Sequence, residues 1–251
     1  MAGRPDHERA WLPDMTLRSL LVDFNSYFAS VEQQAEPRLR GYLEHDLPEL
    51  ATLPVPLIVN VMGSSRDQVA ELVSAFAARE EVAALELNVS CPNVETGLLM
   101  GADPAEITAL LDRVRPLTAK PLIVKLTPNA TDVPAVAVAA EHSGADAVSL
   151  VNTVRGMALD PRTGQPWLGG VTGGVSGPAV RAIALAQVRA VAQAVEIPIV
   201  GMGGVGRGAD ALDLMRAGAT LVAVGTESFR DPAAGLRVSA ELLELLANSA
   251  V

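Results

Sequence analysis

A single cysteine, Cys91, stands between two asparagines in the segment Asn88-Val-Ser-Cys-Pro-Asn93. A free thiol has a pKa of about 8.5, so a modest lowering by its surroundings makes the thiolate a usable base near neutral pH. The side-chain amides of Asn88 and Asn93 offer donors and acceptors that suit a planar, amide-rich ring such as a pyrimidine. The alternative is that Cys91 is a small buried apolar residue. Its loop position beside a proline favours the catalytic interpretation.

A second reactive group, Lys125, interrupts the apolar run Ile123-Val-Lys-Leu-Thr-Pro128. A lysine inside an apolar strand is costly unless its ammonium meets an anion or a polar ligand. A fixed cation beside a flavin would stabilise the negative charge that the reduced ring acquires. The alternative is a side chain that reaches solvent at the end of the strand.

Glycines form the third group, in Gly201-Met-Gly-Gly-Val-Gly206. The pattern satisfies the Gly-x-Gly-x-x-Gly motif of dinucleotide-binding folds, but that motif belongs near the start of its βαβ unit. Here it follows four other βα units, which favours the phosphate site that the last loops of an α/β barrel commonly form. We expect one phosphate, as in FMN, to be held by Gly177, Gly203, Gly204, Gly225 and Thr226.

The elements that must position these residues are short apolar runs alternating with amphipathic stretches, which indicates repeated βα units with a parallel sheet. Ligands of such sheets bind at the carboxyl ends of the strands. Polar residues lie at these ends. Any one of them taken alone is more simply explained as a turn residue or a helix cap. The six predicted strands are Leu57 to Met62, Ala84 to Val89, Pro121 to Leu126, Asp146 to Val151, Ile197 to Met202 and Leu221 to Gly225. The predicted helices are Asp67 to Ala78, Pro104 to Arg115, Val133 to Ser143, Pro178 to Ala194 and Ala209 to Ala217.

The predicted fold class is an α/β barrel of the TIM (β/α)8 type, truncated at its N-terminal side. Upstream of the six units, a strand is predicted over Leu20 to Phe24 and a capped helix over Asn25 to Gln34. Residues 1 to 16 hold no candidate for a second missing strand. The Gly-rich stretch from Met157 to Gly177 shows no clear periodicity and is predicted as a lid or binding loop, with a surface excursion as the alternative.

Composition excludes several classes of function. The chain has 251 residues, 49% of them hydrophobic, which suits one main domain. A net charge of −10 argues against binding to nucleic acid or anionic lipid. One cysteine permits neither an internal disulfide nor a cysteine-based zinc site, and no metal is predicted. No apolar run approaches the roughly 20 residues of a membrane span, and the first residues lack a secretory signal. A cytoplasmic enzyme acting on a small molecule is expected, with a homo-oligomer left open.

The ordered motifs resemble the dihydroorotate dehydrogenase family over residues 42 to 245, most closely the catalytic subunit of the class 1 NAD-linked type. They are Leu87-Asn-Val-Ser-Cys-Pro-Asn93, Ile123-Val-Lys-Leu-Thr-Pro-Asn129, Leu150-Val-Asn-Thr153, Val171-Thr-Gly-Gly-Val-Ser-Gly-Pro178, Gly201-Met-Gly-Gly204 and Val224-Gly-Thr226. The resemblance implies oxidation of (S)-dihydroorotate to orotate in pyrimidine (UMP) biosynthesis. Cys91 would remove the proton from C5 while the hydride leaves C6 for FMN.

The resemblance also assigns binding positions. FMN positions are Asn60, Asn88, Lys125, Val151, Gly177, Gly203, Gly204, Gly225 and Thr226. Substrate positions are Asn88, Asn152 and Thr153. Asn93 is added as a substrate position because its side-chain amide can also hydrogen-bond the ring. In the NAD-linked type, electrons pass to a partner subunit that carries FAD and an iron–sulfur cluster. Such a cluster would lie on another chain, because this one has no cysteine cluster.

Residues 18 to 41 resemble a different family, the start of a Y-family DNA polymerase, with Asp23 at a metal-ligand position and Tyr27 and Phe28 at the nucleotide pocket. We therefore predict a foreign segment over 1–41 and an incomplete FMN-binding barrel over 42–251. Two alternatives to an active dehydrogenase follow. One is an inactive truncated or chimeric flavoprotein that acts as a binding module, and the other is a polymerase fragment, although two-metal chemistry needs more than one carboxylate.

Overall fold

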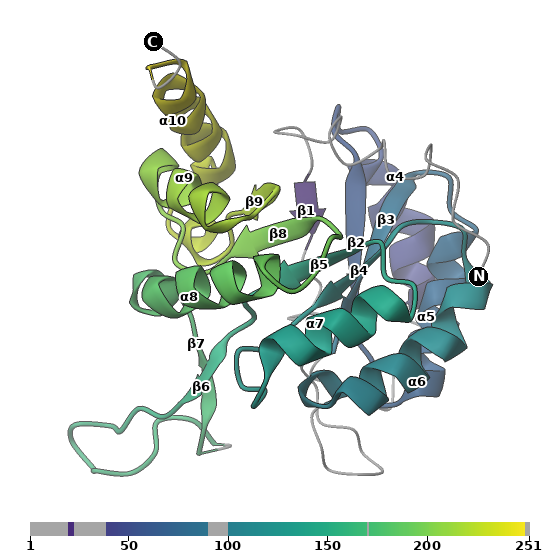
Figure 1. Ribbon diagram of the computed structural model, residues 1–251, viewed down its shortest axis with the longest axis horizontal. Helices are drawn as coiled ribbons and strands as arrows, with labels where there is room; N and C mark the ends of the chain where they lie inside the picture. Colours follow the sequence, from purple (N-terminus) through teal and green to yellow (C-terminus); the bar gives the residue numbers. More distant parts are fainter. Residues whose placement is uncertain (1–19, 23–38, 90–99, 170, 249–251) are drawn as a thin grey trace. The chain divides into compact units, whose positions relative to one another are not determined.

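The computed structural model describes residues 20–22, 39–89, 100–169 and 171–248 (Figure 1). The chain divides into two compact units. The first comprises 1–125 and 139–148, and the second comprises 126–138 and 149–251. The boundary passes through one strand, β5 (Ala147–Leu150), and one helix, α7 (Val133–His142).

The first unit holds a parallel sheet whose strands follow chain order. Its strands are β1 (Leu20–Val22), β2 (Leu57–Val61), β3 (Val82–Asn88), β4 (Leu122–Lys125) and the start of β5. The pairs β1–β2, β2–β3 and β3–β4 are parallel. Every residue of β2 and β4 is buried, as expected for parallel strands covered on both faces. Helix α5 (Arg66–Ala77) packs against β2 and β3, and α6 (Pro104–Val114) packs against α5.

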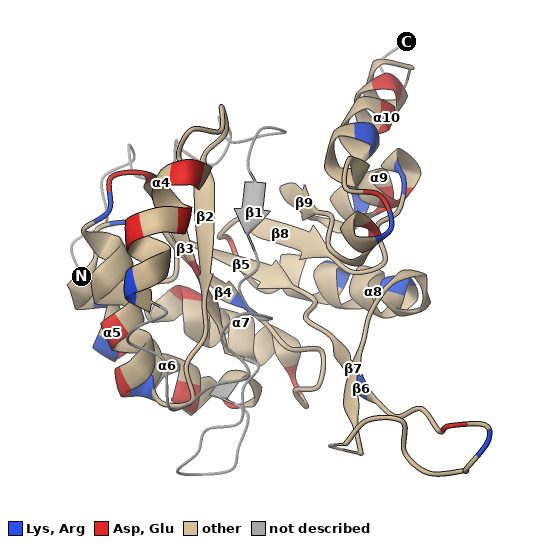
Figure 2. Cartoon of the chain, turned by 180° about the vertical axis from the view of Figure 1, so that it is seen from behind, with Lys and Arg blue, Asp and Glu red and all other residues tan. Residues whose placement is uncertain are grey.

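Side-chain caps begin these two helices. The Ser65 hydroxyl accepts a hydrogen bond from the Gln68 N–H at 3.2 Å, and the Asp103 carboxylate accepts one from the Ala105 N–H at 2.9 Å. Both satisfy amide groups that the first helical turn leaves without partners. Charged residues lie mainly on the helices, whereas the strands carry few of them (Figure 2). The rare charges within strands are therefore informative.

Ahead of β2, the chain forms a π-helical turn over Tyr42–Asp46 and a short helix, α4 (Leu47–Leu50). The ring of Tyr42 is buried edge-on against Phe76 of α5, with ring centroids 5.8 Å apart. Such edge-to-face pairs add to the stabilisation that burial of both rings provides.

We predict that this burial makes stability depend on alkaline pH. Burial, with a smaller contribution from Asp46, raises the pKa of Tyr42 to about 12. An unfolded tyrosine ionises near 10, so the folded protein should lose stability as the pH rises from about 10 to 12. Urea unfolding across this range measures the loss. The variant Tyr42→Phe should lack this component, and an identical loss in that variant would contradict the prediction.

The second unit contains a parallel pair, β8 (Ile199–Met202) and β9 (Leu221–Ala223), which follows the end of β5. Helix α8 (Arg181–Ala192) packs against β8 and α9 (Gly208–Ala217), and α9 packs against α10 (Ala234–Asn248). Short 3-10 turns cover Pro178–Val180 and Thr226–Phe229. In the first unit, similar turns cover Met100–Ala102 and Arg115–Leu117.

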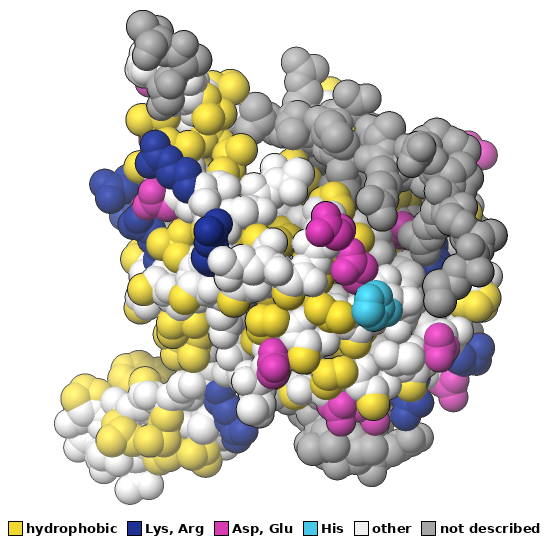
Figure 3. Space-filling view, in the orientation of Figure 1, with side chains coloured by type: hydrophobic (Ala, Val, Ile, Leu, Met, Phe, Trp, Pro, Cys, Tyr) yellow, Lys and Arg dark blue, Asp and Glu magenta, His cyan; other side chains and the backbone are white. Residues whose placement is uncertain are grey.

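The stretch from Met157 to Gly177, for which a lid or binding loop stays a prediction, contains one strand that the sequence did not indicate. Strand β7 (Gly173–Val175) pairs antiparallel with β6 (Val154–Gly156) and forms a ribbon. Apolar side chains are exposed beyond the ribbon, including Trp167 at 63% (Figure 3). The six predicted strands and five predicted helices are present with ends shifted by a few residues. The predicted helix over 25–34 lies outside the described residues.

Candidate active site

Three polar side chains meet inside the sheet of the first unit. Asn60 of β2, Glu86 of β3 and Lys125 of β4 are 3%, 1% and 5% exposed. The Asn60 amide Nδ2 donates a hydrogen bond to Glu86 Oε2. Lys125 Nζ lies 3.6 Å from the same oxygen. One buried carboxylate thus holds an amide and an ammonium from its two neighbouring strands.

Strand register explains why these side chains meet. Asn60 is paired with Glu86 across β2 and β3, and Asn88 is paired with Lys125 across β3 and β4. Glu86 and Asn88 are two residues apart on one strand, so their side chains point to the same face of the sheet. All four side chains therefore share one face, near the carboxyl ends of their strands. Asn88 is 2% exposed.

Asn60 is incompletely satisfied. Its Oδ1 atom is buried and accepts no hydrogen bond from the residues that the structure describes. Burying an unpaired amide oxygen costs about 1 to 3 kcal/mol. This acceptor lies beside a buried ion pair. Such an arrangement is typical of a binding site, because an N–H or O–H group of a ligand can donate the missing hydrogen bond.

Glu86 is the functional candidate that the sequence reasoning missed. The sequence did contain a signal for Glu86, which is a carboxylate inside the apolar run Ala84-Leu-Glu-Leu-Asn88. Burying its charge there is as unfavourable as burying the charge of Lys125 in its own strand. Two buried opposite charges on successive strands predict an ion pair if their strands are neighbours.

In the second unit, the predicted glycines gather around the ends of β8 and β9. A Cβ atom on Gly203 would lie 3.0 Å from the Val151 side chain, and one on Gly177 would lie 3.7 Å from that of Thr226. Gly204 has a φ of +74°, and a Cβ there would lie 2.7 Å from that of Arg181. Gly203 and Gly204 are therefore required by positive φ and by close packing against the start of α8.

Gly225 differs from these glycines, because nothing lies within 4 Å of the position of its Cβ. Open space beside backbone amides at the ends of two strands is what a phosphate needs. The structure thus places Val151 next to Gly203 and Gly177 next to Thr226, and it leaves space at Gly225.

Asn152 and Thr153 follow β5 and are tied to the loop after β4. Asn129 Nδ2 donates to the Thr153 carbonyl at 3.0 Å, and Asn129 Oδ1 accepts from the Arg155 N–H at 2.9 Å. Asn152 Oδ1 accepts from the Thr153 N–H at 2.8 Å. Asn129 was not predicted as a site residue, yet it connects the loop after β4 to Thr153 and Arg155, where the loop after β5 meets β6.

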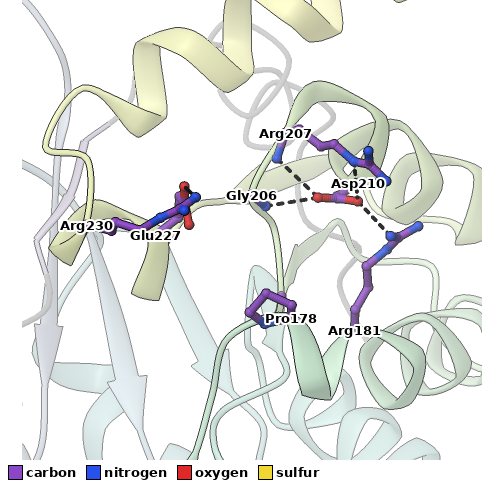
Figure 4. Close-up of a pocket in the computed structure, with 8 residues that line it drawn as sticks. Pro178, Arg181, Gly206, Arg207, Asp210, Glu227 and Arg230 are labelled. Carbon is purple, nitrogen blue, oxygen red and sulfur yellow. Dashed lines mark hydrogen bonds and ion pairs between the residues drawn. The ribbon is translucent and has the colours of Figure 1, made fainter.

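A cavity of about 310 Å³ adjoins the glycines (Figure 4). Arg181 lies 2.7 Å from Asp210, whose other oxygen accepts from the N–H groups of Gly206 and Arg207 at 3.1 Å each. Across the cavity, Arg230 pairs with Glu227. These arginines are already matched by carboxylates, so the contacts fix the loops after β8 and β9. The lining residues are Pro178, Arg181, Gly204, Gly206, Arg207, Asp210, Glu227 and Arg230.

A family model described as dihydroorotate dehydrogenase matches residues 27–246. The chain belongs to the dihydroorotate dehydrogenase family. Dihydroorotate dehydrogenase B (NAD(+)), catalytic subunit, of Geobacter metallireducens is 46% identical over 212 residues, which are 84% of this chain and 70% of the relative. The protein of the same description from Bacillus pumilus is 44% identical over 212 residues, or 84% of this chain and 68% of the relative.

A solved dihydroorotate dehydrogenase shares the fold. The crystal structure of DHODH in complex with ferulenol from Eimeria tenella matches with a TM-score of 0.66 at 23% identity. The match covers 86% of this chain and 64% of the Eimeria chain, so the present chain spans less than two thirds of that protein. The predicted α/β fold of TIM-barrel type is confirmed as a partial barrel.

Several predicted features of this dihydroorotate dehydrogenase family member lie outside the described residues. These are Cys91, Asn93 and the polymerase-like residues Asp23, Tyr27 and Phe28. Within the described ranges, no group of three histidine, cysteine, aspartate or glutamate side chains is arranged to hold a metal ion. No helix in the same ranges is long and apolar enough to cross a membrane.

Proposed function

We propose that this chain catalyses the FMN-dependent oxidation of (S)-dihydroorotate to orotate, a step of pyrimidine biosynthesis. The observation that carries the proposal is the buried Asn60–Glu86–Lys125 cluster in a chain of this family. Its unused amide oxygen and its cation suit a ring that offers an N–H group and gains negative charge on reduction. The glycines at the ends of β8 and β9, with open space at Gly225, suit the phosphate.

The roles of the residues follow from this assignment. Bound FMN supplies an acceptor for the hydride that leaves C6 of the substrate. Cys91 takes the C5 proton on its sulfur, so that the two hydrogens leave as a proton and a hydride. Asn88, Asn93, Asn152 and Thr153 hold the substrate ring through hydrogen bonds. Asn129 keeps the loop of Asn152 and Thr153 in place, and Lys125 stabilises the charge of the reduced flavin.

The proposal also covers the electron acceptor. The curated relatives are catalytic subunits of an NAD(+)-linked enzyme. We infer that electrons leave this chain through a partner subunit with FAD and an iron–sulfur cluster. The purified chain should then reduce an artificial dye with dihydroorotate but fail to reduce NAD(+) until such a subunit is added. Failure to reduce any dye after incubation with FMN would overturn the proposed function.

Two alternatives concern the N-terminal segment. If the chain is an inactive flavoprotein fragment that acts as a binding module, it will bind FMN without turning over substrate. If residues 18–41 confer polymerase chemistry, the protein will bind primed DNA in the presence of Mg²⁺. The division at residue 42 stays a prediction, and the family match begins at residue 27, inside the segment proposed as foreign.

Substitution of Gly225 tests the phosphate cradle. Gly225→Ala adds a methyl group in open space, at a backbone conformation (φ −107°, ψ −93°) outside the regions that alanine prefers, so thermal unfolding of the variant is measured beside its FMN affinity. FMN should bind at least about tenfold more weakly, or about 1.4 kcal/mol, because the methyl group occupies the phosphate's space. The matched control is Gly235→Ala on exposed α10, where a Cβ also meets nothing within 4 Å. Quenching of FMN fluorescence measures both affinities, and equal values for the two variants would exclude a phosphate at Gly225.

A further inference from the structure

Glu86 stands out among the polar groups of the described chain because the proposed mechanism gives it no role. It is almost completely buried, and one of its oxygens contacts both Asn60 and Lys125. Both of these neighbours occupy proposed FMN positions. Burying a carboxylate this deeply costs free energy of folding unless it is well partnered. Its presence at this point of the sheet therefore suggests a functional role.

The chemistry of the carboxylate determines how the Asn60 amide is turned. A carboxylate accepts hydrogen bonds and has none to donate, so the amide group that faces Glu86 must be the NH₂ group. The amide oxygen is then turned away from Glu86. This is the Oδ1 atom that accepts no hydrogen bond within the described part of the chain.

We infer that Glu86 is a positioning residue for the flavin, which acts through Asn60 and Lys125 and makes Asn60 an acceptor toward a donor group of FMN. Without the carboxylate, the amide can turn over and present its NH₂ group instead. The inference rests on the proposed function. Two groups of oxidised FMN have the required chemistry, the ring N3–H and a ribityl hydroxyl.

Glu86→Gln tests the positioning role, since glutamine has nearly the same shape but can present its NH₂ group to Asn60, and the Asn60 amide is then no longer held in one orientation. FMN binding should weaken at least tenfold, and the flavin absorption bands should shift. Removing a negative charge beside the flavin should also raise its midpoint potential. In the double variant Glu86→Gln/Asn60→Ala, the loss of affinity should be smaller than the sum of the two single losses, because Glu86 acts through Asn60.

The control is Asp146→Asn, which alters another ion pair of the first unit. Asp146 lies 2.7 Å from Arg115 and accepts from the Leu122 N–H, at the start of the strands. This variant should lower thermal stability without changing FMN affinity or the flavin spectrum. If Glu86→Gln behaves as the control does, the inference is overturned while the proposed function stands. If the parent chain binds no FMN, the proposed function itself fails.

A second experiment uses Asn60→Ala, which does not depend on the folding of Glu86→Gln. FMN methylated at N3 lacks the ring donor, and the 2′-deoxy, 3′-deoxy and 4′-deoxy forms of FMN each lack one ribityl donor. One of these analogues should bind the parent chain more weakly than FMN does but bind Asn60→Ala as well as FMN does. The analogue that behaves this way identifies the donor. If none of these penalties diminishes in Asn60→Ala, the acceptor role of Asn60 is wrong.

Discussion

Cys91→Ala is expected to bind FMN as tightly as the parent chain and to oxidise dihydroorotate at least about 100-fold more slowly. A positioned general base contributes roughly 10² to 10⁴ in rate, and alanine has no group that takes the C5 proton. Cys91 is not among the FMN positions that the resemblance assigns, so the affinity for the cofactor should not change.

The measurement for Cys91 is anaerobic bleaching of the flavin in a single turnover. Dihydroorotate should bleach the parent chain rapidly and the variant slowly, while FMN titrations give equal affinities. Addition of dithionite should bleach both proteins, which shows that the flavin of the variant is still reducible. Full turnover by Cys91→Ala would mean that another group removes the proton.

Lys125→Ala should have the second large effect, and it should affect both stability and cofactor binding. Removing one partner of a buried ion pair typically costs about 3 to 5 kcal/mol, because the remaining charge stays buried and uncompensated. Glu86 is the charge that would remain. The free energy of unfolding should fall by this amount, and FMN should bind more weakly because the cation near the ring is lost.

Lys120→Ala is the matched control for Lys125→Ala. Lys120 precedes β4 and donates to the Val82 carbonyl at 2.7 Å from a partly buried position. It holds no buried anion, so its loss should cost about 1 kcal/mol and leave FMN affinity unchanged. Urea denaturation and FMN titration of both variants make the comparison. Equal effects at the two positions would contradict the role given to the ion pair.

The elements that the sequence predicted best are the buried parallel strands. A strand covered on both faces is a continuous apolar run, and Leu57–Val61 and Leu122–Lys125 follow that pattern. The β6–β7 ribbon escaped prediction because its exposed residues show no apolar alternation and Gly173 and Gly174 interrupt it. A Cβ on Gly174 would lie 2.3 Å from the Thr153 hydroxyl, so this glycine is needed for a tertiary contact.

The candidate site was predictable in part for a similar reason. Lys125 and the glycines could be predicted from the sequence. A lysine in an apolar strand and glycines directly after a strand each have few structural explanations besides a binding site. The contact of Glu86 with Asn60 and Lys125 depends on the register of three strands, which no single segment encodes. The role of Asn129 likewise depends on two loops that lie 24 residues apart in sequence.

The most direct test of the proposed function is the absorbance spectrum of the purified chain with FMN under anaerobic conditions. After gel filtration the protein should keep flavin bands at about one FMN per chain. Dihydroorotate should bleach these bands, with one orotate formed for each flavin reduced. A protein that emerges colourless from incubation with FMN, or whose bound flavin stays oxidised in the presence of dihydroorotate, would contradict the assignment.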